Sequence, residues 1–145
     1  MTDTHSIIVT ASAEKTFQIG SQLGQTLHAP CVIAFSGDLG AGKTTFIRGL
    51  ASSLGIDERE ICSPTFTYLN IYQGSTVIYH FDLYRIPSQR EFEAAGFDEY
   101  LHTDGICCIE WSEKIAPLLQ ERAHLRVVRV SIAHAGDGLR EICIA

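Results

Sequence analysis

A glycine-rich segment holds the residues of this sequence with the clearest chemical signature. Residues 37–44 read Gly-Asp-Leu-Gly-Ala-Gly-Lys-Thr and fit the phosphate-loop pattern G-x-x-x-x-G-K-[ST]. The segment follows the apolar run Cys31 to Ser36 and precedes a helical pattern from Lys43 to Leu54, which is the context that the pattern requires. Chance produces it in well under about 1% of chains of this length. We therefore interpret it as a functional phosphate loop and not as a glycine turn alone.

Main-chain amides are the expected phosphate donors, because they replace water around an anion without losing side-chain entropy. Glycines let successive amides turn inward, and the helix near Lys43 adds the positive end of its dipole. Lys43 would reach the β and γ phosphates, the Thr44 hydroxyl would bind Mg²⁺, and Thr45 would bond the α phosphate. The predicted nucleotide-binding residues of the loop are Asp38, Leu39, Gly40, Ala41, Gly42, Lys43, Thr44 and Thr45.

Two acidic residues at the ends of apolar runs could complete a magnesium site. Asp82 ends the run at residues 77–81, and Glu110 ends the run at residues 106–109. Ligands of open α/β sheets gather outside the carboxyl ends of the strands, so both carboxylates would emerge beside the loop. Either could bind the metal directly or through water, or orient an attacking water. Without the phosphate loop, a helix cap or a surface turn would be the preferred interpretation of each acid.

The presence or absence of other motifs indicates which nucleobase is bound and which reaction is catalysed. The N-K-x-D motif of guanine-specific proteins is absent from the sequence, and its absence favours adenine. The L-S-G-G-Q signature of ABC-type ATPases is also absent. A free-standing small-molecule kinase is the alternative to an ATPase, because such kinases combine this loop with an Asp that acts as base. Asp82 would then be the base, and Arg85 and Arg90 lie where an arginine-bearing lid is expected.

Hydrophobic periodicity predicts alternating strands and helices around these residues. A glycine pair, Gly20 and Gly24, lies in the first helix and is expected to allow close packing against another element. The expected elements are a strand at Ser6 to Thr10, a helix at Ala13 to Leu27, a buried strand at Cys31 to Ser36, a helix at Lys43 to Leu54, paired strands at Phe66 to Tyr72 and Thr76 to Phe81, one or two short helices within Ser88 to Leu101, a strand at Gly105 to Ile109, and a terminal hairpin at Leu125 to Ile132 and Leu139 to Ile144.

This element order predicts an α/β fold. The run Cys31 to Ser36 is apolar on both faces, as in a central parallel strand covered on each side. The two hairpin-like pairs add antiparallel strands. We expect a P-loop NTPase-like sheet, mixed but mostly parallel and flanked by helices, in a single P-loop ATPase domain at residues 1–145.

Composition and charge exclude several classes of protein. The chain has 145 residues, of which 46% are hydrophobic and 19% charged, a mixture typical of folded domains. The formal net charge of −6 argues against a lone nucleic-acid binder. The longest apolar run, Ala29 to Phe35, is far shorter than the roughly 20 residues of a membrane helix, and residues 1–6 carry no secretion signal. A cytoplasmic location is therefore expected, with the five cysteines reduced and mostly in the core.

Four sequence blocks, in their order and spacing, resemble the TsaE family. They are GDLGAGKTTFIRGLA (Gly37 to Ala51), SPTFTY (Ser63 to Tyr68), HFDLYR (His80 to Arg85) and IEW (Ile109 to Trp111). Members of that family are small bacterial ATPases required for threonylcarbamoyladenosine modification of tRNA. The resemblance implies a subunit that binds ATP and ADP with Mg²⁺ and hydrolyses ATP, weakly when alone. It would act with the transferase TsaD and with TsaB, and would meet tRNA only through that complex.

The resemblance also implies roles for single residues. Thr44 and Glu110 would bind Mg²⁺, Asp82 would be a catalytic or metal-orienting acid, and Lys43 would be the phosphate lysine. Two further features follow from the matched blocks: a switch-like loop of Ser63, Pro64 and Thr65 facing the γ phosphate, and Trp111 near the nucleotide or the TsaD surface. Outside these blocks, Arg140 matches a family arginine close to the nucleotide.

Several side chains have simpler structural interpretations. His80 is expected to be a satisfied strand histidine rather than a proton shuttle. Arg85 could pair with a nearby acid or face phosphate. Cys107 and Cys108 are adjacent in a strand, so their side chains point to opposite faces and a bond between them would be strained. Three tyrosines are expected to pack on the sheet rather than to stack on bases, namely Tyr68, Tyr72 and Tyr79.

Overall fold

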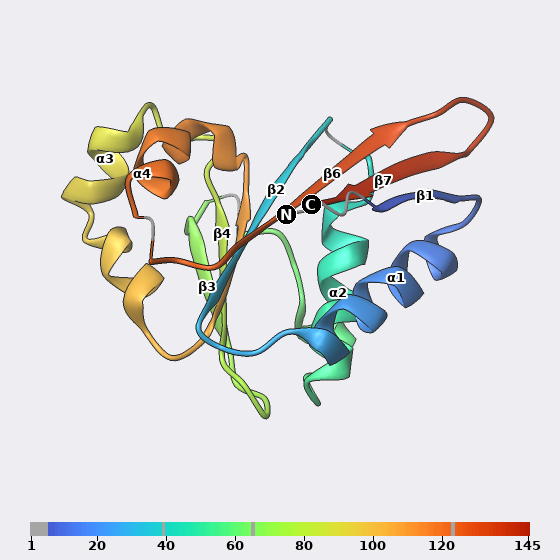
Figure 1. Ribbon diagram of the computed structural model, residues 1–145, viewed down its shortest axis with the longest axis horizontal. Helices are drawn as coiled ribbons and strands as arrows, with labels where there is room; N and C mark the ends of the chain where they lie inside the picture. Colours follow the sequence, from blue (N-terminus) through green and yellow to red (C-terminus); the bar gives the residue numbers. More distant parts are fainter. Residues whose placement is uncertain (1–5, 39, 65, 123) are drawn as a thin grey trace.

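The computed structural model describes residues 6–38, 40–64, 66–122 and 124–145. Within these ranges seven strands form one sheet in the order β1-β7-β6-β2-β5-β4-β3, with helices on both faces (Figure 1). The elements are β1 (Ser6–Thr10), α1 (Ala13–Thr26), β2 (Cys31–Gly37), α2 (Lys43–Ser53), the 3₁₀ helix η1 (Glu58–Glu60), β3 (Leu69–Tyr72), β4 (Ile78–Asp82), α3 (Gln89–Ala94), η2 (Phe97–His102), β5 (Ile106–Glu110), η3 (Ser112–Ile115), α4 (Ala116–Glu121), β6 (Val127–His134) and β7 (Arg140–Ile144).

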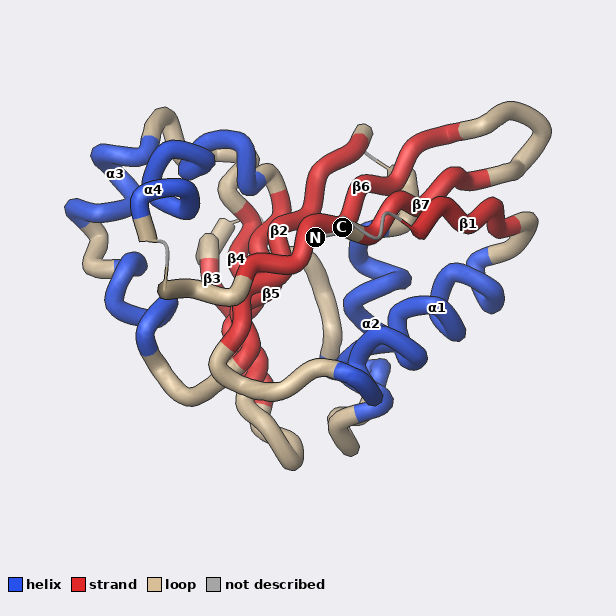
Figure 2. Tube along the Cα trace, viewed as in Figure 1, coloured by secondary structure: helices blue, strands red, loops and turns tan. Residues whose placement is uncertain are grey.

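The middle of the sheet is parallel and its edges are antiparallel. Strands β6, β2, β5 and β4 run in the same direction. Antiparallel pairing adds β7 and β1 beyond β6, and β3 beyond β4. The β6–β7 hairpin ends in a loop that projects away from the centre of the sheet (Figure 2). These pairings confirm the predicted α/β fold, a mixed and mostly parallel sheet with hairpin additions.

The central strand β2 explains why two cores form. Its residues alternate between the faces: Ile33 and Phe35 pack on the side of α1 and α2, whereas Val32 and Ala34 pack on the side of α3 and α4. All four side chains are buried. A strand covered on both faces must be apolar throughout, and the sequence of β2 meets that requirement.

Helices α1 and α2 pack closely because α1 carries glycines where it meets α2. A Cβ at Gly20 would lie 2.1 Å from the carbonyl oxygen of Phe46, and one at Gly24 would lie 2.0 Å from Oγ of Ser53. The predicted close packing of the two glycines is confirmed. Since α2 begins at Lys43, this contact also anchors the helix that follows the phosphate loop.

The structure corrects some predicted boundaries. The strand predicted from Phe66 begins only at Leu69, because Tyr68 has a φ of 66° and its N–H donates to the carbonyl of Pro64 at 2.8 Å, which closes a turn. Strand β4 begins at Ile78 and not at Thr76. Helices η3 and α4 were not predicted. Among the described residues, no helix combines the length and the apolar character needed to cross a membrane.

Candidate functional site

The glycine-rich loop leaves β2 and enters α2, as its pattern requires. Gly37 ends β2 with a φ of 136°, and a Cβ there would lie 2.1 Å from the carbonyl oxygen of Ile132 in β6. Gly42 caps α2 in the left-handed region, with a φ of 113°. Residues with a Cβ are strained at such φ angles, so the backbone conformation requires glycine at these two positions. Leu39, expected to contribute to this loop, lies outside the described residues, as does Thr65 of the expected switch-like loop.

A cavity of about 480 Å³ opens beside the loop, at the carboxyl ends of the parallel strands. Strand register explains why Asp82 and Glu110 meet there, because Asp82 is the register partner of Glu110 and Glu110 is the partner of Phe35, two residues before the end of β2. The cavity is lined by Gly40, Gly42, Lys43, Thr44, Thr45, Ser63, Asp82, Tyr84, Glu110 and Trp111. It brings together the three predicted catalytic residues and both predicted magnesium ligands.

Lys43 is buried, although it carries a cationic group. Its Nζ donates to the carbonyl oxygen of Gly37 at 2.7 Å and lies 4.3 Å from the ring centroid of Trp111. Trp111 follows Glu110 with a φ of 58°, a turn that places its ring over the lysine. Neither the carbonyl nor the ring carries a negative charge, so the ammonium itself can bind an anion that enters the cavity.

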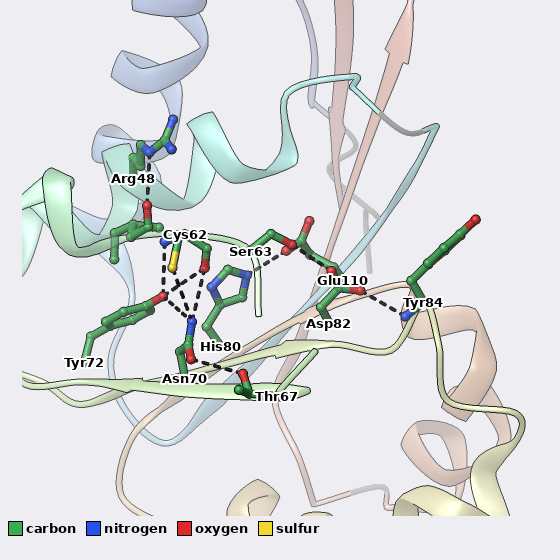
Figure 3. Close-up of polar contacts among 11 residues, drawn as sticks. Arg48, Cys62, Ser63, Thr67, Asn70, Tyr72, His80, Asp82, Tyr84 and Glu110 are labelled. Atoms are coloured by element: carbon green, nitrogen blue, oxygen red, sulfur yellow. Dashed lines mark hydrogen bonds and ion pairs between the residues drawn. The ribbon is translucent and has the colours of Figure 1, made fainter. Parts of the chain in front are cut away.

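Asp82 is held by donors from two different segments (Figure 3). The Ser63 hydroxyl donates to Oδ2 at 2.7 Å, and the main-chain N–H of Tyr84 donates to Oδ1 at 2.9 Å. Both of its carboxylate oxygens are thus oriented. Sequence reasoning did not identify Tyr84 as part of the site, since a main-chain donor leaves no signature in a side-chain pattern.

Glu110 is paired with a buried histidine. Nε2 of His80 lies 2.7 Å from Oε2 of Glu110, and the side chains are 0% and 5% exposed (Figure 3). The prediction of a satisfied strand histidine is correct for Nε2 only, because no partner among the described residues bonds Nδ1. The pairing joins β4 to β5 across 30 residues of sequence and was not predicted.

Arg140 reaches the phosphate loop from β7. Its Nε donates to the carbonyl of Ala41 at 3.1 Å. It lines a smaller hollow of about 150 Å³ that shares three residues with the larger cavity, namely Gly40, Gly42 and Thr45. Asp38 accepts a 3.1 Å hydrogen bond from the N–H of Ala41 through its main-chain carbonyl, and its side chain is not among those that line either hollow.

The remaining candidates have structural partners. Arg85 lies 4.9 Å from the ring centroid of Phe66 and is not among the residues that line the cavity. Among the described residues it forms no ion pair with an acid. Tyr72 packs against His80, and Tyr79 against Tyr100, as expected of sheet-packing rings. No disulfide joins the five cysteines, all of which lie in described positions and are free.

The oxygen ligands at the cavity suit a hard divalent ion such as Mg²⁺. In the described ranges no group of three or more His, Cys, Asp or Glu side chains could enclose a metal. Mg²⁺ needs no such group, because it binds through one or two protein oxygens while phosphate and water complete its six ligands. The Thr44 hydroxyl and the Glu110 carboxylate at one cavity match that requirement.

Comparison with known proteins gives a consistent assignment. The family model for "Threonylcarbamoyl adenosine biosynthesis protein TsaE" matches residues 10–142. The tRNA threonylcarbamoyladenosine biosynthesis protein TsaE of Treponema pallidum is 42% identical over 94% of this chain and 98% of its own length. The protein of that name from Bacillus subtilis is 40% identical over 92% of this chain and 80% of its own.

A solved structure agrees with the sequence comparisons. The crystal structure of YdiB from Bacillus subtilis superposes with a TM-score of 0.74 and 33% identity, over 97% of this chain and 84% of that one. The chain therefore belongs to the TsaE family of tRNA threonylcarbamoyladenosine biosynthesis proteins.

Proposed function

We propose that this chain is a Mg²⁺-dependent ATPase subunit of the machinery that makes threonylcarbamoyladenosine in tRNA. The observation that carries the proposal is the single cavity that Lys43, Thr44, Asp82 and Glu110 share at the start of α2. A phosphate loop, a hydroxyl and two carboxylates at the ends of neighbouring strands form a set suited to nucleotide hydrolysis.

The phosphates would lie at the N-terminus of α2. Main-chain amides around residues 40–45 and the positive end of the helix dipole would bind them. Lys43 would leave the carbonyl of Gly37 for the β and γ phosphates, a stronger partner for an ammonium than a carbonyl dipole. The smaller hollow beside Arg140 adjoins this region and would accept part of the nucleoside, on the far side of the α phosphate from the β and γ phosphates.

Thr44 and Glu110 would hold Mg²⁺, whose chemistry is to neutralise charge on the phosphate oxygens. Asp82 would orient the attacking water, because its carboxylate is fixed by Ser63 and by the N–H of Tyr84. The Ser63 loop would therefore link the position of Asp82 to the γ phosphate.

TsaD and TsaB are the proposed partners. Family membership supports a role in the same modification, and the net charge of −6 is consistent with a subunit that meets tRNA through other proteins. The transfer chemistry would belong to TsaD, and ATP hydrolysis here would reset the complex between cycles.

The test is Mg²⁺-dependent release of phosphate from ATP, measured for the chain alone and with TsaD and TsaB. Lys43→Ala is expected to weaken ATP and ADP binding at least about tenfold, since a charge-assisted contact is lost. Glu110→Gln is expected to lower the hydrolysis rate more than the ATP affinity. Lys15→Ala, an exposed lysine on α1, is the matched control and should behave as the parent.

Parental rates in both site variants would show that the site is assigned wrongly. Labelled ATP distinguishes the free-standing kinase from the ATPase. Label that appears in a small metabolite would identify a kinase, whereas label found only in inorganic phosphate supports the ATPase.

A further inference from the structure

The buried pair of His80 and Glu110 has a geometry that packing alone does not require. His80 precedes Asp82 by two residues on β4, and its register partner Cys108 precedes Glu110 by two residues on β5. The imidazole thus lies on the same face of the sheet as both acids and reaches diagonally to Glu110 at 2.7 Å. Figure 3 shows the ring directed at this carboxylate, while Asp82 is bonded to Ser63 and Tyr84.

The chemistry of the pair assigns the proton between them. A carboxylate accepts hydrogen bonds, so the hydrogen lies on Nε2 of His80 and is donated to Oε2 of Glu110. Oε1 is left outside this bond, and Glu110 lines the cavity. One carboxylate oxygen is therefore fixed by the protein while the other is available to a ligand in the cavity.

The environment of the other ring nitrogen, Nδ1, indicates that His80 is not needed for packing alone. Nδ1 is buried and has no hydrogen-bond partner among the described residues. The neighbouring residues on the same face of β4 and β5 include Ile78 and Cys108, so an apolar side chain would pack there without an unpaired nitrogen. The bond to Glu110 is the one polar contact of His80 in the described part of the chain that offsets this cost.

We propose that His80 is a positioning residue that fixes the Glu110 carboxylate for magnesium in the nucleotide complex. The inference rests on the proposed function, because it takes Glu110 as a metal ligand. His80 touches neither nucleotide nor metal in this account. It acts by holding Oε2, so that Oε1 faces the ion without loss of rotamer freedom on binding.

Two variants separate the hydrogen bond from packing. His80→Leu removes the hydrogen-bond donor and replaces the imidazole with an apolar side chain of similar volume. His80→Gln keeps an N–H donor at the place of Nε2. Mn²⁺ replaces Mg²⁺ as the probe, since its binding to the ADP complex can be followed by electron paramagnetic resonance without turnover.

The expected result is a selective loss of metal affinity. His80→Leu should bind Mn²⁺ about tenfold more weakly in the ADP complex, as is usual when the partner of a metal ligand is removed. His80→Gln should remain within about threefold of the parent. ADP affinity in chelator, measured by calorimetry, should be unchanged in both variants, because the phosphate-binding amides are not altered.

Each other outcome overturns the inference in a recognisable way. If His80→Leu binds Mn²⁺ like the parent while the parent hydrolyses ATP, His80 is a packing residue and the proposed function stands. Equal weakening in both variants would show that ring shape matters and the donor does not. A parent that neither binds Mn²⁺ with ADP nor hydrolyses ATP removes the function and this inference together.

A spectroscopic measurement on the metal-free parent keeps the test decisive if His80→Leu does not fold. Nitrogen-15 correlation spectra distinguish the two ring nitrogens, and His80 should carry its hydrogen on Nε2. Glu110→Gln should shift that nitrogen signal. A hydrogen found on Nδ1 with Nε2 bare would overturn the proposal.

Discussion

At the scale of single residues, buried polar side chains concentrate where the chemistry is proposed. Lys43, His80, Asp82 and Glu110 are all at most 5% exposed, and three of them line the cavity beside the phosphate loop. Burial of such groups is costly unless they are bonded. Here each has a named partner: the Gly37 carbonyl for Lys43, the Ser63 hydroxyl for Asp82, and each other for His80 and Glu110.

Ser63→Ala is expected to lower ATP hydrolysis about tenfold with little effect on ADP affinity. The substitution removes a hydrogen bond to a charged group, worth about 1.5–3 kcal/mol, from the acid that would orient water. Steady-state kinetics and calorimetry measure the two quantities. Thr67→Val alters an exposed hydroxyl of the same loop and is the control. An equal fall in both variants would show that loop order, and not Asp82, limits the reaction.

The cysteines should differ sharply in reactivity. Burial raises the pKa of the Cys107 thiol to about 12 and also raises the pKa of Cys108, whereas Cys62 is exposed. The reactive thiolate is therefore scarce at the two strand cysteines at about pH 8. Mass spectrometry after brief labelling should find Cys62 modified and the strand pair protected until the protein unfolds. Rapid native labelling of Cys108 would contradict its placement in the core.

The same thiols predict a loss of stability in alkali. A folded-state pKa raised above the ordinary thiol value of 9.0 means that the unfolded chain ionises first. The contribution of Cys107 to the free energy of unfolding is fully present below about pH 9. It declines as the pH rises toward the folded-state pKa of about 12. Denaturant unfolding at increasing pH should show this decline, and Cys107→Ala should reduce its slope. Equal slopes in the two proteins would assign the decline to other groups.

At the scale of elements, the contact between α1 and α2 determines where the helix that follows the glycine-rich loop lies. Gly20 and Gly24 on α1 meet the backbone of Phe46 and the side chain of Ser53 on α2. Close approach of two helices needs residues without side chains at the crossing, and main-chain atoms cannot move aside as a flexible side chain can.

Gly20→Ala tests this contact, because the sign of the change in stability shows whether there is room for a Cβ. Alanine normally stabilises a helix by about 1 kcal/mol relative to glycine, so an open site would gain stability. Here the new Cβ would meet the Phe46 carbonyl at 2.1 Å, and overpacking of this kind costs about 1–3 kcal/mol. Denaturant unfolding should show a net loss, while Gln22→Ala on the exposed face should be neutral. Stabilisation by Gly20→Ala would mean that the helices are farther apart.

At the scale of the whole molecule, the sheet gathers the site from distant parts of the chain. Its parallel centre directs the ends of β2, β4 and β5 to one edge, and β7 brings Arg140 back to Ala41. The balance of 11 basic and 17 acidic residues gives a molecule that repels polyanions overall, apart from the site proposed for phosphate.

The isolated chain is therefore expected to bind tRNA more weakly than about 100 μM at physiological salt, the weak end of non-specific binding. Fluorescence anisotropy with labelled tRNA measures this affinity, and addition of TsaD and TsaB should bring the chain into a tRNA-containing complex. Tight, salt-sensitive binding by the chain alone would contradict the proposal that tRNA is met through partners.

Local patterns in the sequence were sufficient for much of this description. The phosphate loop is a contiguous motif, and the periodicity of β2 and α2 on either side of it predicted the strand and helix that the structure contains. Acids placed at strand ends, Asp82 and Glu110, could also be identified, because the rule that relates strand ends to ligands needs only the element order. These features depend on neighbours within a few residues.

The partners of those residues were decided only by the tertiary structure. His80 meets Glu110 through the register of β4 against β5, and Arg140 meets Ala41 through the order of β7 in the sheet. Strand register and order are set by the packing of the whole core, which balances many small terms at once, so no local pattern in the chain encodes them.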